Sequence, residues 1–586
     1  MTPENRNLIL AVTLSMAVLF GWQLLVIQPE MEKEQARQAM LAEQQAIKKD
    51  LNSTQDVGTP MVSASSGGQV TPDASLQNNI STDIATRVTI DAPLVQGSLS
   101  LQGARIDDIV LTGYRETLDT DSENISFLRK TSSQSPFFAE FGWASSDASQ
   151  PMPNAQTVWA ANSDLLSPSS PVSLRWDNGK GLIFTRKISI NNDYLITYDD
   201  TVSSSLDSAI TMYPYGLVRR QGTPSMSGLY ILHEGPLGVF DQTLDEQDYS
   251  DLKDAPSGRI KVETAEPGGW IGITDKYWLA ALLPSQQNKF TFSFQSLPGK
   301  ADRYQADYIN KSGQILAAGG VVSTQGRLFA GAKKVVLLDH YKDELGIPNF
   351  DLAIDFGWFY FLTKPFFYAI NWLFQLFGNF GVATIAFTVV VKLAFFPLAN
   401  KSYRSMAKMR ILTPKLQLLR ERFGDDRMKL NQEMMALYKA EKVNPAAGCL
   451  PVLLQIPVFF ALYKVLFVTI EMRHAPFFGW VADLSAPDPT SVFNLFGLLP
   501  YSVDFLPSFL QLGLWPIFMG ISMFFQMRLN PAPPDPIQAK IFQWMPVFFT
   551  FLLATFPAGL VIYWTWNNLL SMAQQWFIMK QVAKSS

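Results

Sequence analysis

One lysine inside an apolar segment is the residue of this chain whose charge is most able to do chemistry. Lys392 lies in the run FGVATIAFTVVVKLAFFPL from Phe380 to Leu398, which is long enough to cross a bilayer. A charged side chain at such a depth costs about 2.5–3.5 kcal/mol on insertion scales, so it should have a role. The candidate spans contain no Asp or Glu that would neutralise it. We therefore expect its partner to be water or an arriving group that carries negative charge.

Two interpretations fit the environment of Lys392. Its ammonium either snorkels to the headgroups or faces a hydrated cavity that opens to the cytoplasm. We favour the cavity, because the other predicted spans also carry uncharged polar groups that need partners inside the bundle. Thr388 lies one turn before Lys392 on the same helical face. The other candidate cavity residues are Gln455, Tyr563, Trp564, Asn568 and Gln575, and further polar groups in the spans are Gln511, Gln526, Asn567 and Gln574.

A basic segment follows the lysine-bearing run. Apolar residues at three- and four-residue spacing, a Gly-Asp-Asp turn and a second apolar stripe predict a hairpin of two helices. This hairpin is either a solvated element whose charges obey the topology rule, or a flexible Met-rich platform for nascent chains, targeting factors or ribosomal RNA. Its candidate contact residues are Lys408, Arg410, Lys415, Arg420, Arg422, Met434 and Met435.

Signatures of enzymes are poor. The three histidines, His233, His340 and His474, lie outside the predicted spans, and His233 does not begin an HExxH motif. The sequence holds no GxSxG motif, Walker A motif or pair of intramembrane aspartates. We therefore predict no catalytic residues, no metal site and no cofactor.

Six spans are predicted to position these groups: Leu8–Ile27, Phe380–Leu398, Cys449–Ile470, Phe509–Leu529, Ile541–Phe556 and Leu560–Met579. The first is interpreted as an uncleaved anchor rather than a signal peptide, because no small-x-small site follows it. Trp358–Phe377 is also apolar, but Tyr360, Lys364 and Tyr368 recur on one helical face, which favours a helix lying in the interface. Lys464, near the outer end of its span, is interpreted as an interfacial anchor.

Charge indicates the orientation of the spans. Residues 401–445 hold eleven Lys and Arg against five Asp and Glu, whereas residues 471–508 hold one Arg and four acids. The positive-inside rule places the first segment in the cytoplasm and the second outside. Both termini are then inside, and the region between the first two spans is outside.

That outer region predicts an all-β sandwich from about Arg87 to Val336. Short alternating runs separated by Gly, Pro, Asn and Asp are typical of such a domain. The runs are Arg87–Ile90, Gly181–Ile190, Tyr194–Val202, Phe290–Gln295 and Lys334–Leu338, with a short helix at Asp339–Leu345. The only cysteine of the chain is Cys449, so this domain must be stable without an internal disulfide.

Several long motifs then point to a known family. FTVVVKLAFFPLANKSYRSMAKMRILTPKLQLLRERFGDD, EMMALYKAEKVNPAAGCLPVLLQIPVFFALY and FPAGLVIYWTWNNLLSMAQQ closely resemble the YidC membrane-protein insertase family. GGWIGITDKYWLAALLP and IDFGWFYFLTKP resemble its long, Gram-negative form. Lys392 stands where many members carry Arg, Thr388 matches a groove Thr, and Trp564 stands where a second Tyr is common. The loop Pro487–Ser508 is longer than the family pattern.

The resemblance implies a polytopic α-helical membrane protein with six spans, a five-helix insertase core and a large extracytoplasmic β-supersandwich domain. The expected domains are an anchor at 1–27, a polar helix and linker at 28–86, the β domain at 87–350, the interfacial helix at 351–379 and the core at 380–586, which includes the hairpin at 401–445.

The function that the resemblance implies is insertion and folding of inner-membrane proteins, through a groove open to the cytoplasm. The implied partners are nascent membrane proteins, the Sec translocon, the ribosome and the lipid bilayer, with no DNA. Because only a short segment follows Met579, ribosome contact is expected through the hairpin. Two other classes stay open: a transporter or channel, and a tethered carbohydrate-binding module that uses Trp143, Trp159, Trp176, Trp270 and Trp278, although core packing of these rings is favoured.

Overall fold

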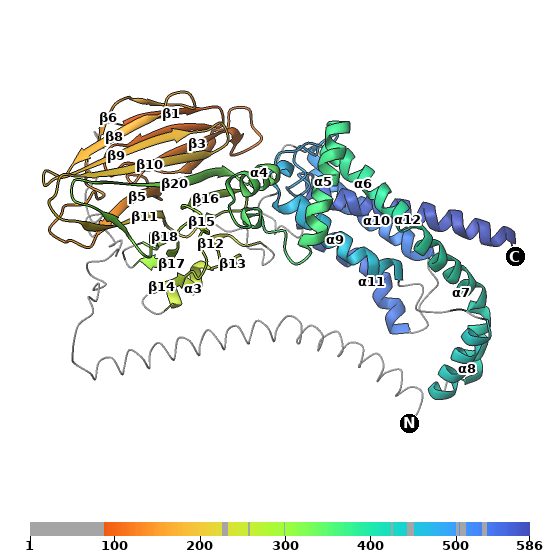
Figure 1. Ribbon diagram of the computed structural model, residues 1–586. Coiled ribbons are helices and arrows are strands. Elements are labelled where there is room, and N and C mark those ends of the chain that lie inside the picture. The colour runs from red at the N-terminus through yellow and green to blue at the C-terminus, as the bar shows by residue number, and fades with distance from the viewer. Residues whose placement is uncertain are drawn as a thin grey trace, which may run out of the picture.

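The computed structural model describes residues 87–224, 232–255, 258–297, 299, 301–423, 426–441, 443, 450–499, 503, 511–529 and 536–585. The expected anchor Leu8–Ile27, the linker that follows it and Cys449 lie outside the described residues. A β sandwich occupies one end of the molecule and a bundle of helices the other (Figure 1).

The first sheet of the sandwich has 11 strands and is antiparallel apart from the pairing of β1 with β7. Its order is β14 (Arg259–Glu263), β17 (Phe290–Leu297), β18 (Arg303–Asn310), β11 (Ile210–Gln221), β5 (Phe137–Ser145), β3 (Arg105–Arg115), β2 (Val95–Ser100), β1 (Arg87–Ala92) and β7 (Leu165–Leu166), with β19 (Gln314–Leu316) on β11 and β4 (Asn124–Leu128) on β3.

The second sheet has 9 strands. Its order is β13 (Thr243–Glu246), β12 (Gly235–Phe240), β15 (Trp270–Thr274), β16 (Trp278–Leu283), β20 (Val321–Ala332), β10 (Leu195–Ser204), β9 (Leu182–Ile190), β8 (Val172–Asp177) and β6 (Ala160–Ala161). The short helix α3 (Tyr249–Asp254) packs against β17. Four of the predicted strand runs are therefore confirmed, in β1, β9, β10 and β17.

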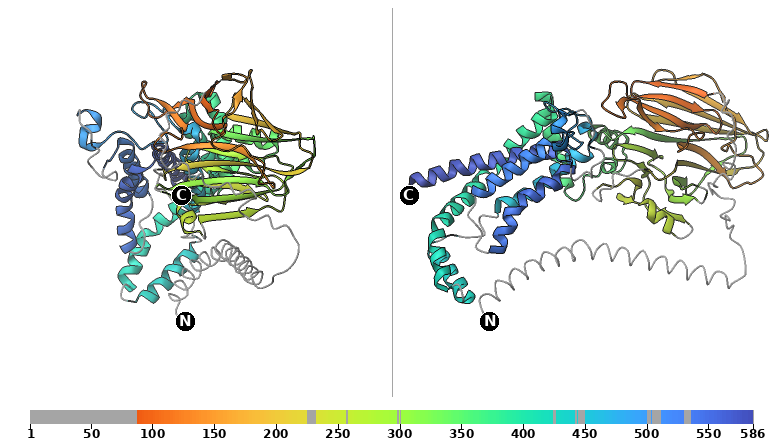
Figure 2. Two further views of the ribbon diagram at one scale, coloured as in Figure 1. Left: turned by 90° about the vertical axis from the view of Figure 1, so that its left-hand side faces the viewer. Right: turned by 180° about the vertical axis from the view of Figure 1, so that it is seen from behind.

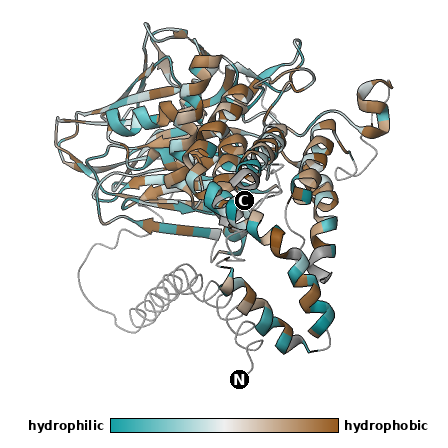
Figure 3. Ribbon diagram, turned by 90° about the vertical axis from the view of Figure 1, so that its right-hand side faces the viewer, coloured by the Kyte–Doolittle hydropathy of each residue, from teal (hydrophilic) through white to brown (hydrophobic). Residues whose placement is uncertain are grey.

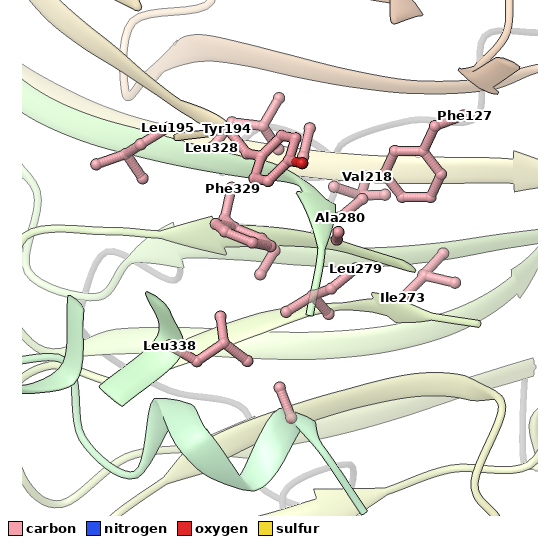
Figure 4. Close-up of a cluster of buried hydrophobic side chains, with 14 of the residues drawn as sticks. Phe127, Tyr194, Leu195, Val218, Ile273, Leu279, Ala280, Leu328, Phe329 and Leu338 are labelled. Carbon is pink, nitrogen blue, oxygen red and sulfur yellow. The ribbon is translucent and has the colours of Figure 1, made fainter. Parts of the chain in front are cut away.

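The fifth predicted strand, Lys334–Leu338, is wrong. Val335 begins the helix α4 (Val335–Leu345), and Val335, Leu338 and Tyr341 are buried on one face at three-residue spacing. Gly346 ends the helix in the left-handed conformation that favours glycine. The close-up in Figure 4 shows Leu338 on the side of the core cluster opposite Leu195 and Tyr194. The apolar run that resembles a strand thus closes one end of the sandwich as a helix.

The tryptophans of the sandwich belong to its core. Trp143, Trp159 and Trp270 are buried, and Trp176 and Trp278 pack against the same core while partly exposed. Core packing, the interpretation favoured from the sequence, is confirmed. These rings are not arranged as an exposed platform for stacking sugars.

The helical part begins with η4 (Phe350–Ala353) and α5 (Tyr360–Phe377). The other elements are α6 (Phe380–Ala394), α7 (Phe396–Phe423), α8 (Arg427–Ala440), α9 (Leu450–Val468), η6 (Ile470–Met472), η7 (Val492–Gly497), α10 (Leu514–Leu529), α11 (Pro536–Leu552), η9 (Leu553–Thr555) and α12 (Ala558–Ser585). Helix α12 contacts α6, α7, α9 and α10. In Figure 3 brown hydrophobic segments dominate the bundle, and teal hydrophilic segments recur along the α7–α8 hairpin.

Among the described residues, no single helix is both long and apolar enough to cross a membrane. The pair formed by Phe380–Ala394 and Phe396–Leu412 meets those requirements together, with a bend of 68° at the break. Gln455–Val468 and Lys540–Thr555 are shorter apolar helical segments.

The predicted continuous helix from Phe380 to Leu398 is wrong at its end. Helix α6 stops at Ala394, and Leu398 belongs to α7. Pro397 explains the break, because it lacks the N–H that a continuous helix would donate to the carbonyl of Leu393. Lys392 therefore lies in the last turn of α6, where the negative end of the helix dipole favours a cation.

Helix α5 lies at the end of the bundle nearest the sandwich (Figure 1) and packs against α6 and α9. Its polar side chains contact the segment that closes the β domain. Lys364 Nζ is 2.6 Å from Asp339 Oδ1 and 2.6 Å from Asp351 Oδ2, and Tyr360 donates a hydrogen bond to Asp351. Burial opposes ionisation, but the hydrogen bonds from Lys364, Tyr360 and Lys342 lower the pKa of Asp351 to about 2. The polar stripe of α5 thus holds the helix against the β domain.

A second junction ties the C-terminal end of α9 to the β domain. Lys464 Nζ lies 2.9 Å from Asp355 Oδ2, which also accepts a 3.2 Å hydrogen bond from the backbone N–H of His233. Arg473 donates a 2.6 Å hydrogen bond from Nη2 to the Arg115 carbonyl. Lys464, interpreted from the sequence as an interfacial anchor, has an ion-pair partner within the protein. These contacts fix the bundle relative to the sandwich.

Candidate functional site

The ammonium of Lys392 is held between two helices far apart in the sequence. Its Nζ donates a 2.7 Å hydrogen bond to Oγ of Ser571 on α12, and that hydroxyl donates a 2.8 Å bond to the carbonyl of Asn567. Within the described part of the chain, Lys392 has no carboxylate partner. One neutral acceptor thus orients the ammonium and leaves two of its three N–H groups for other partners.

Thr388 presents a hydroxyl to the same region. Its Oγ1 donates a 2.7 Å bond to the carbonyl of Thr384, and Thr384 in turn donates a 2.9 Å bond to the carbonyl of Phe380. Both threonines are buried. Because each hydroxyl proton is used within α6, Thr388 offers an arriving group only the acceptor lone pairs of its oxygen.

These side chains line a cavity with an empty volume of about 520 Å³, including its open mouth. Seven of the twelve lining residues carry a polar group on the side chain. The surface that the lining presents to the cavity is nevertheless mainly apolar, so water held there depends on these few polar groups for the two to four partners that it needs. The lining residues are Thr388, Val391, Lys392, Phe395, Leu398, Ala399, Tyr403, Gln455, Val458, Tyr563, Asn567 and Gln574.

Four of the candidate residues named from the sequence meet in this cavity: Thr388, Lys392, Gln455 and Tyr563. They come from α6, α9 and α12, which the predicted bundle required to be neighbours. The cavity has one fixed cation and no lining carboxylate. Its electrostatics therefore favour water or an anionic occupant over a second cation.

The other three candidates lie on a neighbouring face of α12. Trp564 packs edge-on against Phe459, with ring centroids 4.6 Å apart. Asn568 donates a 3.0 Å bond to Ser522 Oγ, and Gln575 donates a 3.1 Å bond to the carbonyl of Leu529. These side chains join α12 to α9 and α10 and are absent from the cavity lining.

The helix period explains the difference. Tyr563, Asn567, Ser571 and Gln574 follow one another at steps of four, four and three, so they share a face. Trp564 and Asn568 are one residue further on, which rotates them by about 100°. From the sequence, Asn567 and Gln574 were predicted only as polar groups of the spans, and Ser571 and Tyr403 were not predicted at all. The spacing from Tyr563 was the signal that identifies Ser571.

The start of α7 lines this cavity through Leu398, Ala399 and Tyr403, and the rest of the α7–α8 hairpin carries the predicted basic surface. Leu412, Leu416 and Tyr438 are buried between its helices, with Met434 partly buried against them. Met435 is exposed. The basic candidates Lys408, Arg410, Lys415 and Arg422 are exposed, and Arg420 is half-buried. The hairpin thus offers charge and one exposed methionine outward, while Met434 contributes to its own packing.

Nothing in the described residues resembles a metal centre, since no group of three or more His, Cys, Asp or Glu side chains comes together there. One titratable group with a strongly altered pKa at the junction is Glu471 of η6. Burial raises the pKa of its carboxyl to about 7, although hydrogen bonds from backbone N–H groups, including that of Val335, oppose the shift. This group lies at the junction with α4 and not in the cavity.

Comparisons with known proteins cover nearly the whole chain. Residues 87–369 match the family model described as YidC periplasmic domain, and residues 372–585 match the model described as 60Kd inner membrane protein. Membrane protein insertase YidC of Methylobacterium nodulans is 49% identical over 585 residues, covering 99% of this chain and 95% of the relative. That of Nitrobacter hamburgensis is 50% identical over 597 residues, covering 99% and 96%.

Among solved structures, an active YidC insertase crystal structure with the first transmembrane domain resolved matches with a TM-score of 0.34 and 17% identity. The match covers 83% of this chain and 92% of that one.

Proposed function

The chain belongs to the YidC family of membrane protein insertases, and from this premise we propose that the cavity around Lys392 receives the polar segments of client proteins during insertion. Members of the family are inner-membrane proteins with a periplasmic domain, which corresponds to the β sandwich of this chain. The family is not enzymatic.

The observation that carries the proposal is the arrangement of Lys392. Its ammonium is held by Ser571, has no carboxylate partner among the described residues and lines the cavity. A cation in the membrane without an internal counter-ion gains free energy when an anionic group arrives. A Lys in place of an Arg keeps this attraction but loses the bidentate fork.

The physical sequence of insertion follows from hydration. A polar, acidic tail of a client enters the cavity and exchanges bulk water for cavity water and the ammonium, so it loses less hydration at once. The short apolar helices thin the bilayer next to them, so the client segment has less hydrocarbon left to cross. The client's apolar helix then moves into lipid, driven by burial of its side chains and assisted by the membrane potential. No bond is made or broken, and no nucleotide or cofactor is needed.

The partners proposed beyond the client are the Sec translocon and the ribosome. The exposed basic surface of the α7–α8 hairpin supports ribosome contact, because exposed Lys and Arg attract the phosphates of ribosomal RNA. Six spans with both termini in the cytoplasm remain the proposed topology, based on the excess of Lys and Arg in residues 401–445.

The test is insertion of a single-span client with either an acidic or an uncharged tail. Lys392→Ala should lower insertion of the acidic client about tenfold, equivalent to about 1.4 kcal/mol, while Lys392→Arg keeps it. Insertion of the uncharged client should change much less. If Lys392→Ala and the parent protein inserted acidic clients equally well, the charge of Lys392 would have no part in the mechanism.

A crosslinking pair tests the route itself. A photoreactive residue at Thr388, inside the cavity, should crosslink to a stalled client, while one at Trp564, packed against Phe459, should do so weakly. Equal crosslinking from both positions would place the client elsewhere on the bundle. Ion flux through liposomes without any client would favour the channel interpretation instead.

A further inference from the structure

The connection between η6 and α10 contains an apolar projection that the insertion mechanism does not use. It comprises residues 491–499 and includes η7 (Val492–Gly497), and is called the apolar tip below. From Pro489 to Val503 the sequence has no Lys, Arg, Asp or Glu.

The base of the apolar tip is held firmly on the bundle. Asp488 accepts a 2.8 Å hydrogen bond from the backbone N–H of Trp515, at the start of α10, and a 3.1 Å bond from the indole N–H of Trp480. Thr490 accepts a 3.0 Å bond from the N–H of Leu514, and Val492 donates a 2.9 Å bond to the carbonyl of Leu512. The segment therefore leaves the bundle from a fixed point.

The backbone of the apolar tip turns sharply. Leu495 has φ 52° and Phe496 has φ 59°, both in the left-handed region that bulky residues rarely adopt. Two backbone hydrogen bonds stabilise the turn. The N–H of Phe496 donates a 2.7 Å bond to the carbonyl of Ser491, and the N–H of Leu499 donates a 3.1 Å bond to the carbonyl of Asn494. Such strain persists only where the surroundings fix it, and it often marks a functional segment.

The large side chains of the apolar tip are exposed and do not pack into the protein. Leu498 is 83% exposed and Leu495 is 52% exposed. A run this apolar and this exposed marks a contact with a membrane or another protein. The other exposed side chains of the segment are Val492, Phe493, Phe496 and Leu499.

The apolar tip stands out from the end of the bundle that is nearest the β domain. In the left panel of Figure 2 its mid-blue turn stands out sideways from the helices, in the view from the sandwich end. Arg473, a few residues after α9, contacts the β domain, so this end of the bundle is the outer end. Trp480, which bonds Asp488 at the base of the tip, packs against Trp515, and Trp515 packs against Phe518. Trp480 and Phe518 are themselves exposed, so an apolar surface continues from this base onto α10.

We propose that the apolar tip inserts into the outer leaflet beside the bundle, with the side chains of Leu495 and Leu498 among the acyl chains. The absence of Lys and Arg from the segment argues for hydrocarbon as the occupant, because basic residues are what bind anionic headgroups or acidic partners. Continuity with the apolar surface of α10 places it against the membrane rather than against a soluble partner. Because the base of the tip is hydrogen-bonded to the start of α10, its contact with lipid also stabilises the position of that end of α10.

The test uses the full-length protein with Cys449→Ser and one new cysteine, Leu498→Cys, labelled with the fluorophore NBD in phosphatidylcholine liposomes. The expected result is a blue-shifted emission that loses most of its intensity with nitroxide-labelled acyl chains and little with aqueous iodide. The same behaviour in vesicles with and without anionic lipid would confirm apolar rather than electrostatic contact. Val321→Cys is the matched control, since Val321 is an exposed apolar residue at the far end of β20, and its label should be quenched by iodide alone.

Three outcomes would overturn the proposal. Iodide quenching at position 498 places the apolar tip in water. Protection from both quenchers places it against protein, whether its own chain, a second copy or a translocon. Unchanged lipid quenching after Leu495→Glu, read from the same label, would show that the apolar character of the segment does not determine its depth. An unfolding temperature equal to that of the parent protein shows in each case that the labelled variant has folded.

Discussion

Lys392 Nζ and Ser571 Oγ are 2.7 Å apart, so one hydrogen bond joins α6 to α12 across 179 residues. Because the hydroxyl of Ser571 donates its hydrogen bond to the backbone carbonyl of Asn567, its oxygen accepts the hydrogen bond from Lys392. Its oxygen therefore sets the direction of the ammonium inside the cavity. This contact makes Ser571 a positioning residue for the proposed site.

Ser571→Ala should therefore weaken function without removing the charge. A hydrogen bond to a charged group contributes about 1.5–3 kcal/mol, and cavity water replaces part of it, so a loss of about 1 kcal/mol in stability is expected. Insertion of an acidic client should fall by less than in Lys392→Ala, and Ser571→Thr should restore it. A full Lys392→Ala phenotype in Ser571→Ala with normal stability would instead show that the hydroxyl contacts the client.

The ion pair between Lys464 and Asp355 is predicted to contribute more than a surface pair. Its side chains are 14% and 22% exposed, and it joins α9 to the segment after the β domain. A double-mutant cycle with Lys464→Met and Asp355→Asn should give a coupling of about 1–2 kcal/mol in detergent unfolding. The exposed pair Lys415–Glu441 on the hairpin, 2.7 Å apart, is the control and should give below about 0.5 kcal/mol. Similar couplings for both pairs would mean that the junction is hydrated.

The attachment of α5 should be sensitive to acid. Because the pKa of Asp351 is lowered to about 2, its carboxylate stabilises the fold above its usual pKa near 3.8, and this stability is lost as the pH falls from about 4 towards 2. Lys364→Met removes the main cation and should move this loss to higher pH, while Lys364→Arg should not. Thermal unfolding measured between pH 2 and 6 checks this. Identical acid profiles for Lys364→Met and the parent would exclude Lys364 as the cause.

Much of this architecture follows from local sequence pattern. Alternation identifies strands such as β9 and β10, because one face is buried, and the apolar run around Lys392 identifies a helix. What local pattern misses are boundaries and partners. Pro397 ends α6 earlier than hydropathy indicates, and Val335–Leu338 is apolar enough to suit either a strand or a helix until its burial on the sandwich is known.

In the candidate site, too, local sequence pattern identifies some residues, whereas others depend on how the helices pack. Lys392 and Thr388 are identifiable because a charge in an apolar run is costly, whatever the fold. The choice between Asn567 and Asn568 depends on the rotation of α12 against α6 and α10, which one sequence does not reveal. The partner of Lys464 is even harder to predict from the sequence, because Asp355 comes close to Lys464 only when the β domain packs against α9.

The last prediction concerns pH at the junction of α4 with η6. Glu471 Oε1 accepts a 3.1 Å hydrogen bond from the N–H of Val335, and Oε2 has no hydrogen-bond partner among the described residues. Burial raises the pKa of this carboxyl from 4.5 to about 7, with Lys334 and the backbone N–H groups opposing the shift. The folded protein thus binds this proton more tightly than the unfolded chain. The stability that the proton provides is complete below about pH 4.5 and is lost as the pH rises to 7.

Glu471→Gln should remove this dependence while keeping an acceptor for Val335. At pH 8 the variant should be more stable than the parent by up to about 3 kcal/mol, since each pKa unit corresponds to about 1.4 kcal/mol, and the two should converge near pH 4.5. The measurement is the difference in unfolding temperature between the two proteins from pH 4 to 8. Glu433→Gln, at an exposed position on α8, is the control and should show a constant difference. A constant difference for Glu471→Gln as well would mean that water reaches its carboxylate and that the junction does not respond to pH.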